Sequence, residues 1–303
     1  MKKGSIIALL LVPFIIISYF VFNKYKEYTS RIYLLEKNLT SLNKTIIKKE
    51  LIKNNFQKID KLFTQPEVRV LSHTYTFNKL TNKKAPKNYF YDTRFFQSFS
   101  YNKFPHIFVG DFIWSDTKED LKVYKEYEEN KMIYLMKGNH ESMSSLDKKL
   151  KGDYDFKIGN FHFICVETKQ QKDGKLLFNE ETLSFLEKII LDSQNSDDEK
   201  VYKKIVLIHH NIFTNELNSN LPYQELEPLK QKIKDLSPSA VIIGDGGAKS
   251  HLLSINDEDL NLFLTGFPYV NIDSPPKWID LYPNYISVMV NIDEELYEKK
   301  FIY

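Results

Sequence analysis

Apolar residues form one uninterrupted, uncharged run near the start of the chain, Ile6–Phe22. Its length lies at the lower limit for a helix that crosses a bilayer. Lysines precede and follow the run, and no small-residue cleavage site comes after it. We therefore predict an uncleaved transmembrane anchor over residues 1–23, with a cleaved signal peptide or a buried core helix as alternatives. The short basic start favours an extracytoplasmic location for the rest of the chain, whereas the lysines after the run favour the opposite orientation.

A helical pattern without Gly or Pro follows, from about Asn23 to Phe63. Within it, apolar residues recur at alternating spacings of four and three, as in a coiled-coil seam. Residues 24–64 are therefore predicted to form a helical, coiled-coil stalk that would join two copies of the chain in a homodimer. An amphipathic helix packed on its own domain explains the pattern equally well. Gln65 and Pro66 end the helical pattern, so the predicted globular domain covers residues 65–303.

From residue 67 onward, short apolar runs alternate with segments of helical period. Continuous apolar runs are typical of strands in sheets that are covered on both faces, so the alternation predicts a layered α/β domain. The predicted strands are Val68–Leu71, Ile107–Gly110, Met132–Met136, Phe161–Val166, Ile205–Ile208 and Ala240–Ile243. The predicted helices are Lys118–Asn130, Glu180–Asp192 and Tyr223–Asp235.

Composition narrows the chemistry that this domain can carry. With 42% hydrophobic and 27% charged residues, the 303-residue chain is typical of a folded protein. A formal net charge of +2 gives no signal for nucleic-acid binding. The single cysteine, Cys165, excludes an internal disulfide and any multi-cysteine metal site. A metal site would have to combine some of the seven histidines with Asp, Glu or Asn.

Polar residues follow the ends of five predicted strands, the positions that line the site in layered α/β folds. Carboxylate, amide and imidazole groups predominate among them, and such ligands suit divalent Mn, Fe, Zn or Mg. The segments are Ser72-His73-Thr74-Tyr75, Gly110-Asp111, Gly138-Asn139-His140-Glu141, His209-His210 and Gly244-Asp245-Gly246-Gly247.

Three of these segments, in this order, resemble the motifs of the calcineurin-like metallophosphoesterase family over about residues 67–303: Gly110-Asp111, Gly138-Asn139-His140-Glu141 and His209-His210. The resemblance implies a four-layer α/β/β/α sandwich with two metal ions bridged by one aspartate, acting on phosphomonoesters or phosphodiesters. It implies that Asp111 is the bridging aspartate and that Asn139 and His209 bind the second metal. It also implies that His140 contacts the phosphate and protonates the leaving oxygen.

Two other motifs of that family are altered in this chain. His73 and Tyr75 occupy the positions of the first motif, Asp-x-His, and Asp245 and Gly247 occupy those of the last, Gly-His-x-His. The second metal therefore keeps Asp111, Asn139 and His209 as ligands. Asp245 is a chemically acceptable fourth ligand. The first metal keeps only Asp111, with His73 and Tyr75 as altered candidates.

Three interpretations follow from this partial ligand set. One is a membrane-anchored hydrolase with a mononuclear or rearranged metal site that holds one or two ions. In this interpretation the ammonium group of Lys249 could replace the missing cation, although an ordinary loop lysine explains Lys249 as well. Another is a catalytically inactive pseudo-phosphoesterase that serves as a membrane-tethered binding or scaffold protein. The third is a local shift in which His251 replaces a missing ligand. The presence of His140 favours chemistry, and His210 has either a supporting or a packing role.

Overall fold

The computed structural model describes residues 57–59, 65–72, 103–113, 118–171, 175–195, 202–213, 226–245, 254–257, 260–265, 277–292 and 295–303. The chain divides into two compact units, Met1–Glu50 and Leu51–Tyr303, and every described residue belongs to the second unit. The predicted anchor and most of the predicted stalk lie outside the described residues. Within the described ranges, no helix is both long and apolar enough to cross a membrane.

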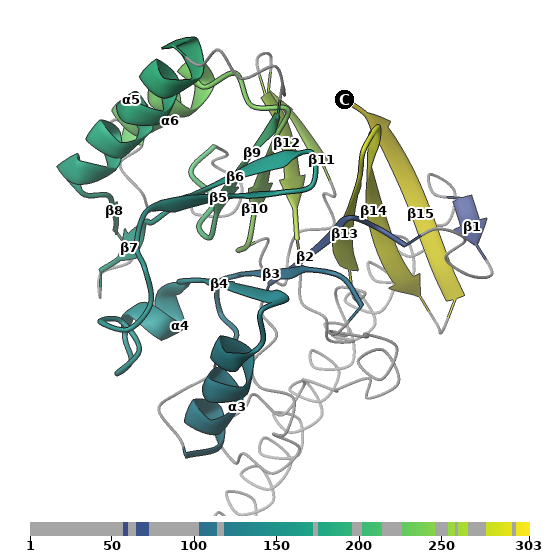
Figure 1. The fold of residues 1–303 in the computed structure, drawn as a ribbon, viewed down its shortest axis with the longest axis horizontal. Helices are drawn as coiled ribbons and strands as arrows, with labels where there is room; N and C mark the ends of the chain where they lie inside the picture. The colour runs from purple at the N-terminus through teal and green to yellow at the C-terminus, as the bar shows by residue number, and fades with distance from the viewer. Residues whose placement is uncertain are drawn as a thin grey trace, which may run out of the picture. The chain divides into compact units, whose positions relative to one another are not determined.

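The first of two large sheets has seven strands in the order β1-β15-β14-β13-β2-β3-β4 (Figure 1). Strands β2, β3 and β4 are parallel, and the others pair antiparallel. Their bounds are β1 Gln57–Ile59, β2 Val68–Leu71, β3 His106–Val109, β4 Ile133–Met136, β13 Lys277–Tyr282, β14 Tyr285–Ile292 and β15 Glu295–Ile302.

The second sheet has six strands in the order β11-β12-β10-β9-β6-β5. Strands β6, β9, β10 and β12 are parallel, so their carboxyl ends lie at one edge. Their bounds are β5 Tyr154–Ile158, β6 Phe161–Val166, β9 Lys203–Ile208, β10 Ala240–Ile243, β11 Ser254–Asp257 and β12 Leu260–Leu264. A separate short hairpin consists of β7 Lys169–Gln170 and β8 Leu176–Leu177.

Three buried apolar clusters show how the layers stack. One holds residues of both large sheets, such as Val70 and Ile107 with Phe163 and Ile205, and fills the space between them. A second joins the other face of the six-stranded sheet to helices α5 (Glu180–Asn195) and α6 (Glu227–Asp235). The third joins the other face of the seven-stranded sheet to α3 (Lys118–Glu129). The layers are therefore helix, sheet, sheet and helix, with the short α4 (Asn139–Ser142) at the end of β4.

The predicted α/β class is confirmed, and all six predicted strands and three predicted helices are present with shifts of a few residues at their ends. The helical prediction is wrong at Gln57–Ile59, which form strand β1. This segment pairs antiparallel with β15, with Gln57 opposite Glu298 and Ile59 opposite Leu296. Backbone pairing with a distant strand has overridden the local helical pattern there.

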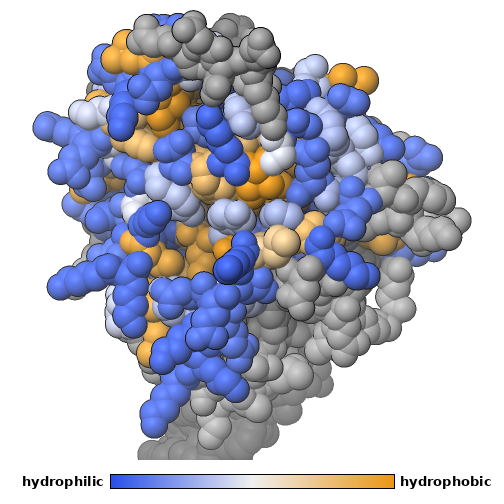
Figure 2. All heavy atoms as spheres, in the orientation of Figure 1, coloured by the Kyte–Doolittle hydropathy of each residue, from blue (hydrophilic) through white to orange (hydrophobic). Residues whose placement is uncertain are grey.

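Polar and charged side chains cover most of the face drawn in Figure 2. The large apolar side chains that are exposed among the described residues lie on separate parts of the chain: Met132, Met143, Leu191 and Ile302. Scattered apolar residues of this kind are normal on a folded domain.

His106, at the start of β3, makes the stability of this domain dependent on pH. Its side chain is buried, its Nδ1 lies 2.8 Å from the carbonyl oxygen of Phe104, and its ring stacks on the Phe104 ring. Burial lowers the pKa of His106 to about 4, and the nearby charge of Arg69 acts in the same direction. The folded domain therefore takes up the proton only well below pH 6.5, and stability is lost as the pH falls from 6.5 toward 4.

Between pH 7 and pH 5, we expect the free energy of unfolding to fall by about 2 kcal/mol more in the wild type than in His106→Phe. The phenylalanine keeps a ring against Phe104 but has no titrating group. Chemical unfolding of both proteins at the two pH values measures this difference. Equal losses in the two proteins would show that His106 does not carry the effect.

Candidate metal centre

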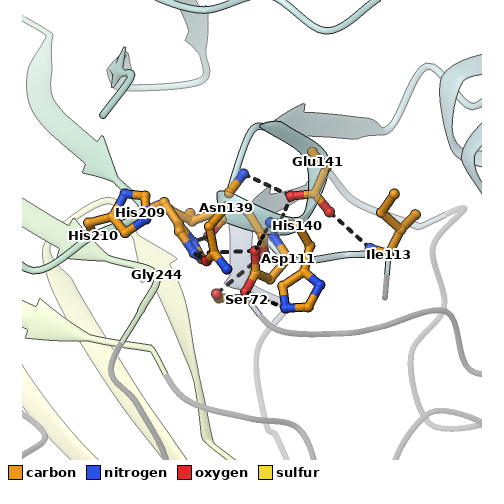
Figure 3. A network of polar contacts seen from close by, with 12 residues as sticks. Ser72, Asp111, Ile113, Asn139, His140, Glu141, His209, His210 and Gly244 are labelled. Atoms are coloured by element: carbon orange, nitrogen blue, oxygen red, sulfur yellow. Dashed lines mark hydrogen bonds and ion pairs between the residues drawn. The ribbon is translucent and has the colours of Figure 1, made fainter. Parts of the chain in front are cut away.

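The candidate ligands follow the carboxyl ends of strands from both large sheets. Asp111 follows β3, and Asn139 and His140 open α4 directly after β4, so the seven-stranded sheet supplies these three. His209 follows β9 of the six-stranded sheet. Figure 3 shows the side chains of Asp111, Asn139 and His209 directed toward one another.

Three atoms with lone pairs converge at this point. His209 Nε2 lies 3.1 Å from Asn139 Oδ1 and 3.3 Å from Asp111 Oδ1. His209 Nδ1 lies 2.8 Å from the carbonyl oxygen of Val109. Because a carbonyl oxygen only accepts, Nδ1 carries the proton, and in the neutral ring Nε2 then directs a lone pair at the two oxygens.

Oxygen and nitrogen ligands about 2.0 to 2.2 Å from a metal ion lie roughly 3 to 3.5 Å apart across tetrahedral or octahedral edges. The separations around His209 Nε2 have this size. The donor set therefore fits one divalent ion held by Asp111, Asn139 and His209. Among the described residues, no group of three or more His, Cys, Asp and Glu side chains could hold a metal, so the Asn139 amide is needed to complete this set.

Glycines make this close approach feasible. A Cβ atom on Gly110 would lie 2.7 Å from the Cα atom of Gly138 and would collide with the ring of His209. A Cβ atom on Gly138 would lie 2.6 Å from the backbone nitrogen of Asp111. Any side chain at either position would therefore push the turns after β3 and β4 apart.

The backbone after β3 takes an unusual path that presents the Asp111 carboxylate. Gly110 has a φ of 76°, and Asp111 has a φ of 57°, a left-handed conformation that non-glycine residues rarely adopt. Such conformations cost free energy and persist where surrounding contacts hold them. One contact that holds this conformation is a hydrogen bond from the Asp111 N–H to Glu141 Oε2, at 2.7 Å.

Glu141 is fully buried behind the site and accepts three backbone N–H groups. Its Oε2 accepts from Asp111, and its Oε1 accepts from Ile113 at 3.0 Å (Figure 3). Its Oε2 also accepts from the backbone N–H of Gly138 at 2.8 Å. Burial raises the pKa of Glu141 to about 7, and the Asp111 carboxylate also raises it, whereas the three hydrogen bonds lower it. This carboxyl group therefore ties together the turns that follow β3 and β4.

His140 lies at the more open side of the centre. Its backbone N–H donates to Asp111 Oδ1 at 3.2 Å, and its Nε2 lies 4.0 Å from Asp111 Oδ2. Its side chain is 21% exposed, whereas the side chains of Asp111 and His209 are each 1% exposed. His140 is therefore the group in this set best placed to meet a molecule arriving from solvent.

The other predicted site residues have different outcomes. Asp245 is half-buried after β10, and its backbone N–H donates to the carbonyl oxygen of His209, so its use as a ligand stays a prediction. His210 is buried, with its Nδ1 2.7 Å from Thr168 Oγ1. The remaining candidates lie outside the described residues: His73, Tyr75, Lys249 and His251.

Sequence reasoning missed the role of Glu141. An acidic residue three positions after the residue that precedes a helix is a recognised capping pattern, and Gly138 and Glu141 have this spacing. The pattern predicts the bond to Gly138 but not the bonds to Asp111 and Ile113. The carbonyl of Val109, which orients His209, has no side-chain signature and could not be found in this way.

Neither a protein-family model nor a curated protein matches the chain. Among solved structures, a double mutant of Vps29 from Entamoeba histolytica is 13% identical with a TM-score of 0.40, covering 78% of this chain and 98% of that one. Vps29 from Chaetomium thermophilum is 10% identical with a TM-score of 0.40, covering 78% and 97%. A 5'-nucleotidase precursor from Thermus thermophilus is 10% identical with a TM-score of 0.35, covering 78% and 54%. At these identities and TM-scores the matches do not assign the chain to a family.

Proposed function

We propose that this protein is a metal-dependent hydrolase of phosphoric esters, related to the calcineurin-like metallophosphoesterases, with a rearranged site that holds one divalent ion. The observation that carries the proposal is the convergence of Asp111 Oδ1, Asn139 Oδ1 and His209 Nε2 beside the partly exposed His140. Mn, Fe, Zn and Mg all accept such a ligand set.

Each residue of the centre has a proposed role. Asp111, Asn139 and His209 hold the ion, and Asp245 is proposed as a fourth ligand. A divalent ion in such a site lowers the pKa of a bound water and polarises the phosphoryl oxygens. A second ion would use Asp111 with His73 and Tyr75, and the ammonium group of Lys249 is proposed as the substitute where that ion is absent.

His140 is proposed to donate a proton to the leaving oxygen of the ester. We expect His140→Asn to lower kcat by about 100-fold or more while leaving the metal content unchanged, because general acid catalysis contributes roughly 10² to 10⁴. Turnover of phenyl phosphate, whose basic phenoxide leaving group benefits from protonation, and metal analysis of the same preparation measure the two quantities. His162→Asn, at a histidine that pairs with Asp155 on β5, is the matched control and should retain wild-type turnover. Wild-type turnover by His140→Asn would remove His140 from the reaction.

The direct test of the proposed function is metal-dependent turnover by the purified full-length protein. We expect the wild type to bind about one equivalent of metal and to hydrolyse an aryl phosphomonoester or phosphodiester, and we expect Asn139→Ala to lose both properties. Asn261→Ala, on the exposed face of β12, is the matched control and should retain both. Equal turnover by Asn139→Ala and the wild type would contradict the proposal.

The second candidate function is a catalytically inactive pseudo-phosphoesterase that acts as a binding or scaffold protein. The altered first motif, with His73 and Tyr75, and the glycine at position 247 favour it, since a site for two ions lacks most of its ligands. A wild-type protein that takes up no metal after reconstitution, and shows no turnover, would select this candidate.

We further propose that Ile6–Phe22 anchors the protein in a membrane as a single span, with the domain on the extracytoplasmic side. Residues 24–64 are proposed to contribute to a homodimer, apart from the segment that forms β1. Partition of the full-length protein into a membrane fraction resistant to carbonate extraction would support the anchor. Release into the soluble fraction would contradict it.

A further inference from the structure

The candidate metal centre is divided between the two large sheets. Asp111 and Asn139 follow strands of the seven-stranded sheet, and His209 follows β9 of the six-stranded sheet. The 3.1 Å separation between Asn139 Oδ1 and His209 Nε2 therefore depends on how the two sheets are held at this end. Apolar packing between the sheets is non-directional, so polar contacts are better suited to fix such a distance.

One polar contact crosses between the sheets immediately beside Asn139. Lys137 follows β4, and its side chain is 8% exposed. Its ammonium nitrogen lies 3.2 Å from Glu167 Oε1 and 3.2 Å from Asp147 Oδ1. Glu167 follows β6 of the six-stranded sheet, and its side chain is also 8% exposed. This buried ion pair joins the end of β4 to the end of β6.

The next residue makes a second contact, immediately beside His209. Thr168 Oγ1 lies 2.7 Å from His210 Nδ1, and both side chains are buried. The ring of His210 in turn meets the ring of His209 edge-on, with 4.8 Å between the ring centroids. The end of β6 therefore contacts neighbours of both Asn139 and His209.

The backbone of this segment is itself held in place. The N–H of Glu167 donates to Asp153 Oδ1 at 2.7 Å, and Thr182 Oγ1 donates to Asp153 Oδ2 at 2.7 Å. A Cβ atom on Gly152 would lie 2.5 Å from Glu167 Oε2, so the carboxylate fills the space beside that glycine. The backbone of Glu167 is thus attached to α5 through Asp153 and Thr182.

We propose that Glu167 and Thr168 form a brace that sets the separation of Asn139 and His209, and that Lys137, Glu167 and Thr168 are positioning residues of the metal centre. The inference rests on the proposed function, because it assumes that these ligands hold a metal. The brace acts through two contacts, Lys137 to Glu167 and Thr168 to His210. Partners that hydrogen-bond metal ligands directly typically contribute roughly 10- to 100-fold to metal affinity, and we expect an effect of this order from the brace, which acts through the neighbours of Asn139 and His209.

The same chain offers a matched control at the opposite end of the sandwich. Glu67, just before β2 in the seven-stranded sheet, accepts from the backbone nitrogen of Asn160 at 3.3 Å and from Asn160 Nδ2 at 3.2 Å. Asn160 lies just before β6, so this contact also joins the two sheets, but at the amino ends of the strands. Glu67→Gln should affect folding stability and leave the metal centre unchanged.

The test is a cobalt(II) titration of the full-length protein, followed by the visible absorption of bound cobalt and repeated for each variant. We expect Thr168→Val and Lys137→Met to weaken cobalt binding about 10- to 100-fold and to change the absorption spectrum. Thr168→Ser, which restores a hydroxyl group, should recover most of the affinity. Glu67→Gln should bind cobalt as the wild type does. Far-ultraviolet circular dichroism of each variant establishes that it is folded, and Thr168→Val is the milder change if Lys137→Met does not fold.

Three other results of the cobalt titration would count against the brace or against the proposed function. Wild-type cobalt affinity in Thr168→Val and in folded Lys137→Met would overturn the brace while leaving the proposed function intact. Equal weakening by Glu67→Gln would also overturn it, because the effect would then follow general stability. Absence of cobalt binding by the wild type would reject the proposed function and the brace with it.

Discussion

Glu141→Ala is expected to destabilise the domain by at least about 3 kcal/mol and to abolish metal binding. The substitution leaves three buried backbone N–H groups without an acceptor, those of Asp111, Ile113 and Gly138. Each such group costs about 1 to 3 kcal/mol. The left-handed backbone of Asp111 also loses its hydrogen bond to Glu141, and we expect the carboxylate to turn away from Asn139 and His209.

Chemical unfolding and metal analysis of the purified variant measure both effects. Glu187→Ala is the matched control. Glu187 lies on α5, its side chain is 59% exposed, and its described ion pair is with Lys232. We expect this control to remain within about 0.5 kcal/mol of the wild type. If Glu141→Ala left the stability and the metal content unchanged, the Glu141 carboxyl group would not hold the turns after β3 and β4.

Arg69→Met is expected to destabilise the domain by about 3 to 5 kcal/mol without directly removing any ligand of the centre. Arg69 Nε and Nη2 lie 2.6 and 2.8 Å from the two oxygens of Asp280, which is fully buried on the neighbouring strand β13. The guanidinium carbon lies 5.2 Å from the centroid of the Phe104 ring and 5.3 Å from that of Trp278. Removing the cation leaves the Asp280 carboxylate buried with only the Trp278 N–H, at 3.2 Å, as a described donor.

A second substitution separates the lost pair from the lost packing. Adding Asp280→Asn to Arg69→Met should recover much of the lost stability, because it removes the unpaired buried charge. Lys122→Met, at an exposed pair with Glu126 on α3, is the control and should change the unfolding free energy by less than about 0.5 kcal/mol. A loss of under about 1 kcal/mol in Arg69→Met would contradict the prediction, because an unpaired buried carboxylate should cost several kcal/mol.

The central strands could be predicted from the sequence because burial on both faces leaves a continuous apolar run. Strands β2, β6 and β10 have the predicted bounds for this reason. The C-terminal strand β15 was not predicted, because Glu298, Lys299 and Lys300 interrupt its apolar residues. It is a strand because it pairs with β14 along its whole length and with β1. Of these two partners, β14 is the neighbouring strand of a hairpin and β1 lies far away in the sequence, and pairing with a distant segment has no signature in either segment alone.

Sequence reasoning could predict which residues would meet at the candidate metal centre, and it could not predict their separations. Asp111, Asn139 and His209 follow strand ends, and in layered α/β folds such positions meet at one edge. Their separations depend on the packing of the two sheets and on Glu141, Lys137 and Thr168, whose contacts lie far apart in the sequence. In the sequence these supporting residues cannot be distinguished from ordinary turn residues, because their contacts with the ligands or the ligands' neighbours form only in the folded domain.

Crystallography tests most directly whether one metal ion binds to the three ligand atoms that follow strands of the two sheets. Crystals of the protein grown with zinc should give an anomalous difference peak about 2.0 to 2.2 Å from Asp111 Oδ1, Asn139 Oδ1 and His209 Nε2. The same experiment on Asn139→Ala should give no peak there. Zinc bound elsewhere in the wild type, with the Asn139 amide turned so that its Nδ2 donates a hydrogen bond to His209 Nε2, would show that these three atoms do not bind the ion.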